Sequence, residues 1–389
     1  MSVVSVVPVE RTSTNDSDEL VQTRDPRETM RALPSFLQLP ITLLTGKPLV
    51  GQRPLQLSPT HHLVASAASM GAGVAIGLAG LHAGGPWLLL LVPSWAMTLH
   101  AMRNLRMMLF HQCSHRNMYA HPVLDAVIGR AISSLLVIQS FGSYAQEHVA
   151  DHHSIHHMTL RDPTVQALLR TLELRPGMSR RQMWRRVAGK MLSPRFHASF
   201  AVARVRAFLH ESTTGERIAA VAIYAALLAV TAVSGAWLAF VLVWLVPLVL
   251  LFQLSNTLRL CVKHTFPAPD VTERRGKAYY AGLTNAIFLG EPAPSEGQGA
   301  DAWLRWFARM LFVHFPCRYL VLTGDTVVHD YHHRHPSSKR WYDYIFVRQQ
   351  DAENGHPGWP AYREAWGLAP AMNLVFDSLA VADPVEYDV

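Results

Sequence analysis

Two long stretches without a charged residue constrain this chain more than any other feature. Residues 54–102 contain no Asp, Glu, Lys or Arg, and neither do residues 218–258. Each stretch is about twice the roughly 20 residues that a helix needs to cross the hydrocarbon core of a bilayer. Only 16% of the whole chain is charged, against about a quarter in soluble domains. The sequence therefore predicts an integral membrane protein rather than a soluble one with unusually long core helices.

A turn-forming cluster divides each stretch near its middle. The first contains Gly84-Gly85-Pro86 and the second contains Ser234-Gly235. Glycine and proline clusters of this kind interrupt helices. We therefore predict two helical hairpins, with membrane spans at residues 63–82 and 87–109 and at residues 217–233 and 236–258.

Basic residues predict how these hairpins are oriented. The connecting turns carry no Lys or Arg, whereas the outer flanks carry several. These flanking residues are Arg103, Arg106, Arg116, Arg217, Arg259 and Lys263. Because short cytosolic segments are enriched in Lys and Arg, we expect the flanks to be cytosolic, in a bacterial inner membrane. The predicted fold is an all-α integral membrane protein with four transmembrane helices, a helical cytosolic cap (residues 110–216 and 259–389) and both termini in the cytosol.

The remaining segments are predicted from composition. Residues 1–40 are expected to form a disordered polar tail without the apolar core of a secretory signal, and residues 41–389 a single membrane domain. The net charge of +7 fits contact with an anionic leaflet, and no nucleic-acid motif accompanies it. Residues 179–206 alternate basic and apolar side chains. That pattern favours a helix resting on lipid headgroups, or a docking face for an acidic electron-transfer partner.

Clusters of histidine are the strongest chemical signal in the chain. There are 21 histidines, and most fall in a few clusters of the predicted cap. His111 and His115 are four residues apart, which places both on one face of a helix. A second cluster extends over residues 148–157, His264 follows the last predicted span, and a third cluster extends over residues 329–333. All of these groups are predicted to lie on one side of the membrane.

This arrangement predicts a metal centre. A single pair of histidines at helical spacing is weak evidence, but three clusters and one further histidine beside membrane helices are not expected by chance. Neutral imidazole binds iron, copper, zinc and nickel. Nine or more histidines exceed what one ion uses, since zinc takes about four ligands. The sequence therefore implies two metal ions.

The order of the clusters resembles a known superfamily. HxxxH, then HxxxHH or HxxHH, a single His and a final HxxHH are similar to the histidine boxes of the membrane fatty acid desaturase superfamily, which includes alkane hydroxylase-like and 1-alkene-forming members. The resemblance covers residues 60–345 and implies a di-iron site (Fe2+/Fe3+) with O2 as co-substrate. The ligands that it implies are His111, His115, His148, His152, His153, His264, His329, His332 and His333.

The second histidine box fits two registers. The first, HxxxHH, uses His148, His152 and His153, and the second, HxxHH, uses His153, His156 and His157. In the family an Asp-Pro pair usually follows this box after a short interval. Residues 162–163 follow His153 by nine positions and His157 by only five, which favours the first register. One departure from the acyl-CoA desaturases is Leu260, where those enzymes carry an Asn before the isolated histidine.

Carboxylates near the boxes are candidates for orienting the imidazoles. Ligand histidines usually donate their second ring N–H to a carboxylate or carbonyl oxygen. We expect this role for Glu147, Asp162 and Asp330, and consider Asp151 and Asp325 as further candidates.

The implied function is oxidation of an unactivated C–H bond in a fatty acid or acyl lipid, with O2 and two electrons. Desaturation is the first expectation, and decarboxylation to a 1-alkene or hydroxylation of an acyl or alkane chain is the alternative. Glu147 before His148 is similar to the hydroxylase pattern and keeps that alternative open. A separate ferredoxin or rubredoxin with its reductase should supply electrons, because no flavin or iron–sulfur motif is present. A histidine-rich metal transporter or sensor is disfavoured, because the spans lack intramembrane Asp or Glu.

Overall fold

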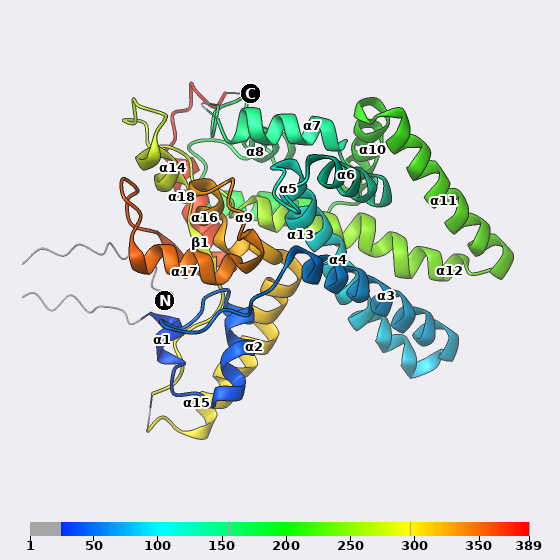
Figure 1. The fold of residues 1–389 in the computed structure, drawn as a ribbon, viewed down its shortest axis with the longest axis horizontal. Coiled ribbons are helices and arrows are strands. Elements are labelled where there is room, and N and C mark those ends of the chain that lie inside the picture. The colour runs from blue at the N-terminus through cyan, green and yellow to red at the C-terminus, as the bar shows by residue number, and fades with distance from the viewer. Residues whose placement is uncertain (1–24, 155, 296, 389) are drawn as a thin grey trace, which may run out of the picture.

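A computed structural model describes residues 25–154, 156–295 and 297–388, and the fold is mostly helical (Figure 1). Three helices are long and apolar enough to cross a membrane: α3 (Pro59–Ala83), α11 (Thr214–Ser234) and the continuous helix Trp237–Leu260. The last of these combines α12 (Trp237–Ala239), a π-helical stretch (Phe240–Leu251) and α13 (Phe252–Leu260). These helices are those of an integral membrane protein.

The first hairpin pairs α3 with α4 (Leu91–Asn104) through glycine. Helix α3 begins at a capping box between Ser58 and His61 and ends at Gly84, which has a positive φ of 65°. Its buried face carries Gly73, Gly77 and Gly80. A Cβ atom at Gly77 would lie 2.5 Å from the Ser94 hydroxyl oxygen, so only glycine permits this approach of the two helices. Close helix contacts of this kind are common in membranes, where small residues let backbones meet.

The predicted second span differs from the other three. Residues 85–90 form a 3₁₀ turn, and the helix then continues through α4, a π-helical turn (Leu105–Leu109) and α5 (Phe110–Ser114). This helix is not among the three that are long and apolar enough to cross a membrane. It carries Arg103 and Arg106 in its C-terminal half. The bent pair formed by α6 (Pro122–Leu136) and residues 141–152, with an angle of 118°, is a further candidate span or re-entrant segment.

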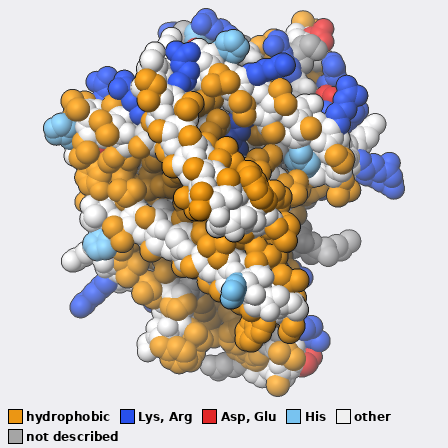
Figure 2. All heavy atoms as spheres, turned by 90° about the vertical axis from the view of Figure 1, so that its right-hand side faces the viewer, with side chains coloured by type: hydrophobic (Ala, Val, Ile, Leu, Met, Phe, Trp, Pro, Cys, Tyr) orange, Lys and Arg blue, Asp and Glu red, His pale blue; other side chains and the backbone are white. Residues whose placement is uncertain are grey.

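The second hairpin joins α11 to α12. Thr213 and Glu216 form a capping box at the start of α11, and Gly235 ends the helix in the left-handed region. Most side chains of α11 are exposed, and Val233 is 92% exposed. Figure 2 shows this end of the molecule covered mainly by hydrophobic side chains, with Lys and Arg toward its margins. Such a surface would be unstable in water and is suited to lipid.

The rest of the chain forms the cap, which packs around the main hydrophobic core. Its further helices are α7 (Phe141–Gln146), α8 (Pro163–Gln166), α9 (Arg180–Met191), α10 (Pro194–Glu211), α14 (Lys277–Leu283), α15 (Ala300–Arg309), α16 (His329–Arg334), α17 (Tyr344–Asn354) and α18 (Leu368–Ala380).

A small parallel sheet departs from the predicted all-α fold. Strand β1 (Ala286–Phe288) pairs with β2 (Glu364–Trp366), with Ile287 opposite Ala365. All three residues of β1 are buried, and segments this short show no strand periodicity in the sequence. The sheet brings Glu364 beside Arg348 on α17, which in turn pairs with Asp330 on α16. Lys47 also pairs with Glu364, so a chain of ion pairs connects the N-terminal segment to the last histidine cluster.

Part of the predicted disordered tail is helical. Residues 1–24 lie outside the described residues. Within the rest of the predicted tail, residues 25–40, the structure has α1 (Pro26–Thr29) and the first part of α2 (Ser35–Thr45). Arg27 has no exposed surface, and its guanidinium donates to Thr42 Oγ1, to the Gln38 side chain and to the backbone oxygen of Lys47. These long-range hydrogen bonds order a segment whose composition alone appeared polar.

The glycine contact between α3 and α4 gives a stability prediction. Gly77→Leu should lower the free energy of unfolding by about 1–3 kcal/mol, because the added side chain overpacks a filled contact. The matched control is Gly71→Leu in the same helix, where a Cβ atom has no neighbour within 4 Å. The measurement is the thermal unfolding midpoint of the detergent-solubilised protein. Equal midpoints for the two variants would contradict a tight contact at Gly77.

Candidate metal centre

Two groups of histidine side chains converge in the cap from segments far apart in the sequence. Within each group, the nitrogen atoms that could bind a metal lie within 4.8 Å of one another. The first group contains His111, His115, His148, His153 and His332, and the second contains His152, His264, His329 and His333. All nine residues that the family resemblance implied as ligands thus lie in one of these two groups.

Local helix geometry decides which histidine joins which group. His111 and His115 lie one turn apart at the end of a long helix, in α5 and at its C-cap. His148 lies in a π-helical turn (Glu147–His152), where the backbone N–H of His153 donates to the oxygen of His148. The wider π turn places residues five apart on one face, so His148 and His153 share the first group.

The adjacent histidine pairs divide between the two groups. Neighbouring residues of a helix point about 100° apart, so His152 and His153 cannot face the same centre. His332 and His333 on α16 differ in the same way. His333 and His329 are four residues apart and share the second group. Each of these two HH doublets therefore places one imidazole in each group.

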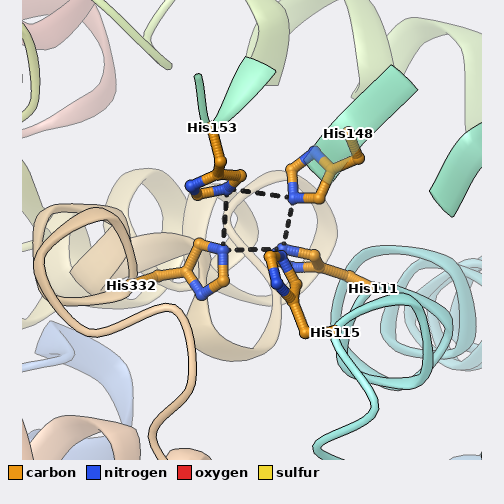
Figure 3. Close-up of side chains that lie close together, drawn as sticks. All are labelled: His111, His115, His148, His153 and His332. Atoms are coloured by element: carbon orange, nitrogen blue, oxygen red, sulfur yellow. Dashed lines mark hydrogen bonds between the residues drawn. The ribbon is translucent and has the colours of Figure 1, made fainter. Parts of the chain in front are cut away.

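The first group surrounds a common point (Figure 3). Its Nε2 atoms form a closed ring, with separations of 2.9 Å between His111 and His332, 2.8 Å between His111 and His148, and 3.1 Å from His153 to both His148 and His332. A neutral imidazole nitrogen either donates or accepts, so it cannot satisfy two such neighbours equally. His115 Nε2 is buried without a partner among the described residues. One cation at the centre would satisfy these nitrogens.

The second group has the same character. His264 Nε2 lies 3.1 Å from His152 Nε2 and 3.3 Å from His329 Nε2, and His333 Nε2 lies 3.1 Å from His329 Nε2. Burial, followed by neighbouring charged groups, lowers the pKa of His264, His329 and His333 well below the ordinary 6.5. These imidazoles are therefore neutral at pH 7, and neutral nitrogen is the form that binds a metal.

His157, from the alternative register of the second box, also reaches the second group. It has no exposed surface, and its Nδ1 lies 2.8 Å from the backbone oxygen of His152. Its Nε2 is buried without a partner among the described residues, and its ring centroid lies 4.6 Å from that of His264. His156 belongs to neither group. Histidines of both registers thus lie close together, and His157 is available to the second group as an additional nitrogen donor.

Of the carboxylates predicted to orient imidazoles, only Asp162 contacts one of the nine histidines. Asp162 Oδ2 accepts from His152 Nδ1 at 2.9 Å, and its two oxygens accept the backbone N–H groups of Met158 and Thr164. Burial acts to raise the pKa of Asp162, but interaction with His152 and His157 outweighs it and keeps the carboxylate ionised. With Nδ1 of His152 held in this way, Nε2 is left as its metal-binding atom.

Glu147 and Asp330 lie differently from the prediction. Asp330 is 3.0 Å from the Arg348 guanidinium and contacts no histidine of either group among the described residues. Its neighbours in α16 point inward, so its own side chain points away from the centre. Glu147 lines a cavity beside His148 and His152. Asp325 accepts a hydrogen bond from Gln112 Nε2 at 2.9 Å, and burial raises its pKa to about 6.

Sequence reasoning missed the place of Lys263 in this centre. It was interpreted only as a cytosolic flank, but its Nζ lies 2.9 Å from His152 Nε2. Its position directly before His264, the isolated histidine, was the signal that could have indicated this.

The model of the fatty acid desaturase family matches residues 85–366. This chain belongs to the fatty acid desaturase family. The family makes the protein an oxidoreductase with a fatty acyl or other lipid substrate, and its histidine groups are compatible with metal binding. No curated protein matches the chain.

Asp162 gives a direct test of ligand orientation. Asp162→Asn removes the charged acceptor from His152 and should lower metal affinity about 10- to 100-fold. Asp151→Asn is the matched control, because the Asp151 carboxylate lies 3.9 Å from the Arg161 guanidinium and forms no ion pair with a described histidine. Metal retained during titration with a chelator measures the effect. Equal retention by the two variants would show that Asp162 does not support the centre.

The two registers are tested by alanine variants of the second box. His148→Ala should reduce the metal content by about half, because it removes a nitrogen from the first group alone, while His156→Ala should leave it unchanged. Metal analysis of the purified proteins gives the result. Loss of metal in His157→Ala together with full retention in His148→Ala would mean that the favoured register is wrong.

Proposed function

We propose that this protein is a membrane-bound di-iron oxidase that uses O2 and two electrons to oxidise an unactivated C–H bond of a fatty acyl chain, with desaturation as the principal outcome. The observation that supports this most strongly is the pair of buried all-histidine groups. Each joins nitrogen donors from distant segments around one point, next to helices suited to a bilayer.

The donor chemistry fits iron. Both groups are built from neutral imidazole, and no cysteine belongs to either group among the described residues. Imidazole without thiolate suits first-row metals such as iron, and the desaturase family provides the reason to choose iron among them. When bound, the iron pair would supply the reduction of O2 and the removal of hydrogen, which protein side chains cannot perform.

The protein would contribute placement and exclusion of water. The histidines of both groups are buried or half-buried, and the Tyr144 ring stacks on His148 at 5.1 Å. Asp162 holds the ring of His152 and sets which nitrogen faces the metal. A dry, rigid donor set keeps a reactive oxidant away from solvent and fixes the position at which a substrate is attacked.

We further propose the predicted topology of four spans, with the cap and both termini in the cytosol of a bacterial inner membrane. The basic flanks of the hairpins support this orientation. Electrons would come from a separate ferredoxin- or rubredoxin-type protein. The basic helix α9 and its neighbour α10 offer exposed arginines for an acidic partner of that kind.

Terminal-alkene formation by decarboxylation remains the second candidate. One observation favours it over mid-chain desaturation, namely the basic cavity beside the histidines that is described below. A metal transporter has less support. Within the described part of α11 the one acidic residue, Glu216, is at the start of the helix and caps it, so it offers no path across the membrane.

The proposal is tested on the purified protein with a reduced electron donor. We expect about two irons per chain, O2 uptake that depends on a fatty acyl substrate, and an oxidised lipid detected by mass spectrometry. His332→Ala should abolish activity and reduce iron, while His82→Ala, at the exposed turn of the first hairpin, should change neither. One zinc per chain, or metal transport without O2 uptake, would overturn the proposal.

A further inference from the structure

A cavity of about 420 Å³ lies directly against the candidate metal centre. Its lining includes His148 from the first group and His152 from the second. A molecule in this cavity would therefore touch both groups at once.

Arg259, Arg106 and Lys263 line this cavity and form no ion pair with a described residue, although Asp325 interacts with Arg259 at longer range. Arg259 is 8% exposed, its Nε is buried without a partner, and its side chain forms no hydrogen bond or ion pair with the described residues. Arg106 is half-buried, with a buried Nη1 lacking a partner and its guanidinium 4.0 Å above the Tyr144 ring. Buried cations without partners are strongly unfavourable, so these two arginines point to an anion.

Lys263 is the third of these cations. Its Nζ contacts His152 Nε2 at 2.9 Å and Thr164 Oγ1 at 3.4 Å. Since His152 Nε2 is the atom available for a metal, the ammonium cannot keep both that contact and a metal-bound His152. Lys263 lines the cavity, so its ammonium can donate to a ligand there.

The other charged residues of the cavity do not compensate these cations. Arg204 donates to the backbone oxygens of Leu136, Val137 and Leu248 and is satisfied. Asp162 is engaged by His152 and two backbone N–H groups. Glu147 and Glu211 line the cavity, but neither forms an ion pair with a described residue, and Glu211 is exposed at the outer side.

The remaining walls are suited to a hydrocarbon chain. They include the apolar side chains Ile138, Phe200, Ala203, Ala207, Phe252 and Leu260. Several belong to α10, whose opposite face exposes Val202, Val205 and Leu209. An alkyl chain could therefore pass along α10 toward the lipid, while its head group meets the arginines.

We infer that this cavity binds the carboxylate of a free fatty acid, held by Arg259 and Arg106 with Lys263. Arginine pairs with carboxylate through two parallel hydrogen bonds and keeps its charge when buried. A thioester or carboxylic ester offers no negative charge at this point, so the free acid is the form that matches the arginines. The inference rests on the proposed function and deepens it. It places the fatty-acid carbons that adjoin the carboxylate close to the two histidine groups.

Binding measured separately from catalysis tests the inference. Purified protein in nanodiscs is titrated with radiolabelled hexadecanoate, with methyl hexadecanoate and hexadecanoyl-CoA as competitors. Wild type should bind the acid, and neither competitor should displace it at equal concentration. Arg259→Met should weaken acid binding about 10- to 100-fold, the effect expected for a lost charged hydrogen bond. Arg259→Lys keeps the charge but loses the two parallel hydrogen bonds, so its acid binding should lie between those of wild type and Arg259→Met.

Arg195→Met is the matched control, because Arg195 lies exposed on α10 outside the cavity lining. Its acid binding should equal that of wild type. The metal content of Arg259→Met should also stay at the wild-type level, which separates loss of the anion site from loss of the centre. Product analysis should then find oxidation at the carbons adjacent to the carboxylate.

Three results would overturn the inference while leaving the proposed function intact. They are equal binding of acid and methyl ester, unchanged binding in Arg259→Met, and a product oxidised only at mid-chain. Absence of iron and of O2 uptake would instead overturn the proposed function, and acid binding would still be measurable.

Discussion

The structure depends on one physical condition, the burial of neutral imidazole nitrogens around two points. Each ring loses its hydration and must present a free lone pair, and a backbone or carboxylate oxygen on the other side of a ring fixes which nitrogen that is. Asp162 provides this for His152, and the backbone oxygen of His152 does so for His157. The helices that carry these side chains are fixed relative to one another by the same requirement, because small shifts would separate the nitrogens.

Local backbone geometry directs the histidines of the second box to two different groups. A regular α-helix would place His148 and His152 together, four residues apart. The π-helical turn over residues 147–152 instead aligns His148 with His153 and releases His152 to the second group. Such single turns are frequent at functional sites. Asp330, next to His329 in the sequence, pairs instead with Arg348.

Much of this could be predicted from composition and spacing. Charge-free runs predicted the apolar helices, and the order of the histidine boxes predicted the family, which the family match confirms. The features that could not be predicted depend on contacts between residues that are distant in the sequence. Nothing near Asp330 in the sequence indicates Arg348, and β1 meets β2 across more than 70 intervening positions. The arginines of the cavity were assigned to topology alone, since a membrane flank and an anion site require the same residue type.

The separation of the histidines in the sequence has a consequence for biosynthesis. His111 and His332, whose Nε2 atoms lie 2.9 Å apart, are 221 residues apart along the chain. Ribosomal synthesis proceeds from the N-terminus, so neither group is complete until the last cluster at residues 329–333 has been made. Every membrane helix is already synthesised by then. A chain that ends before residue 329 therefore contains all of the apolar helices but neither complete histidine group.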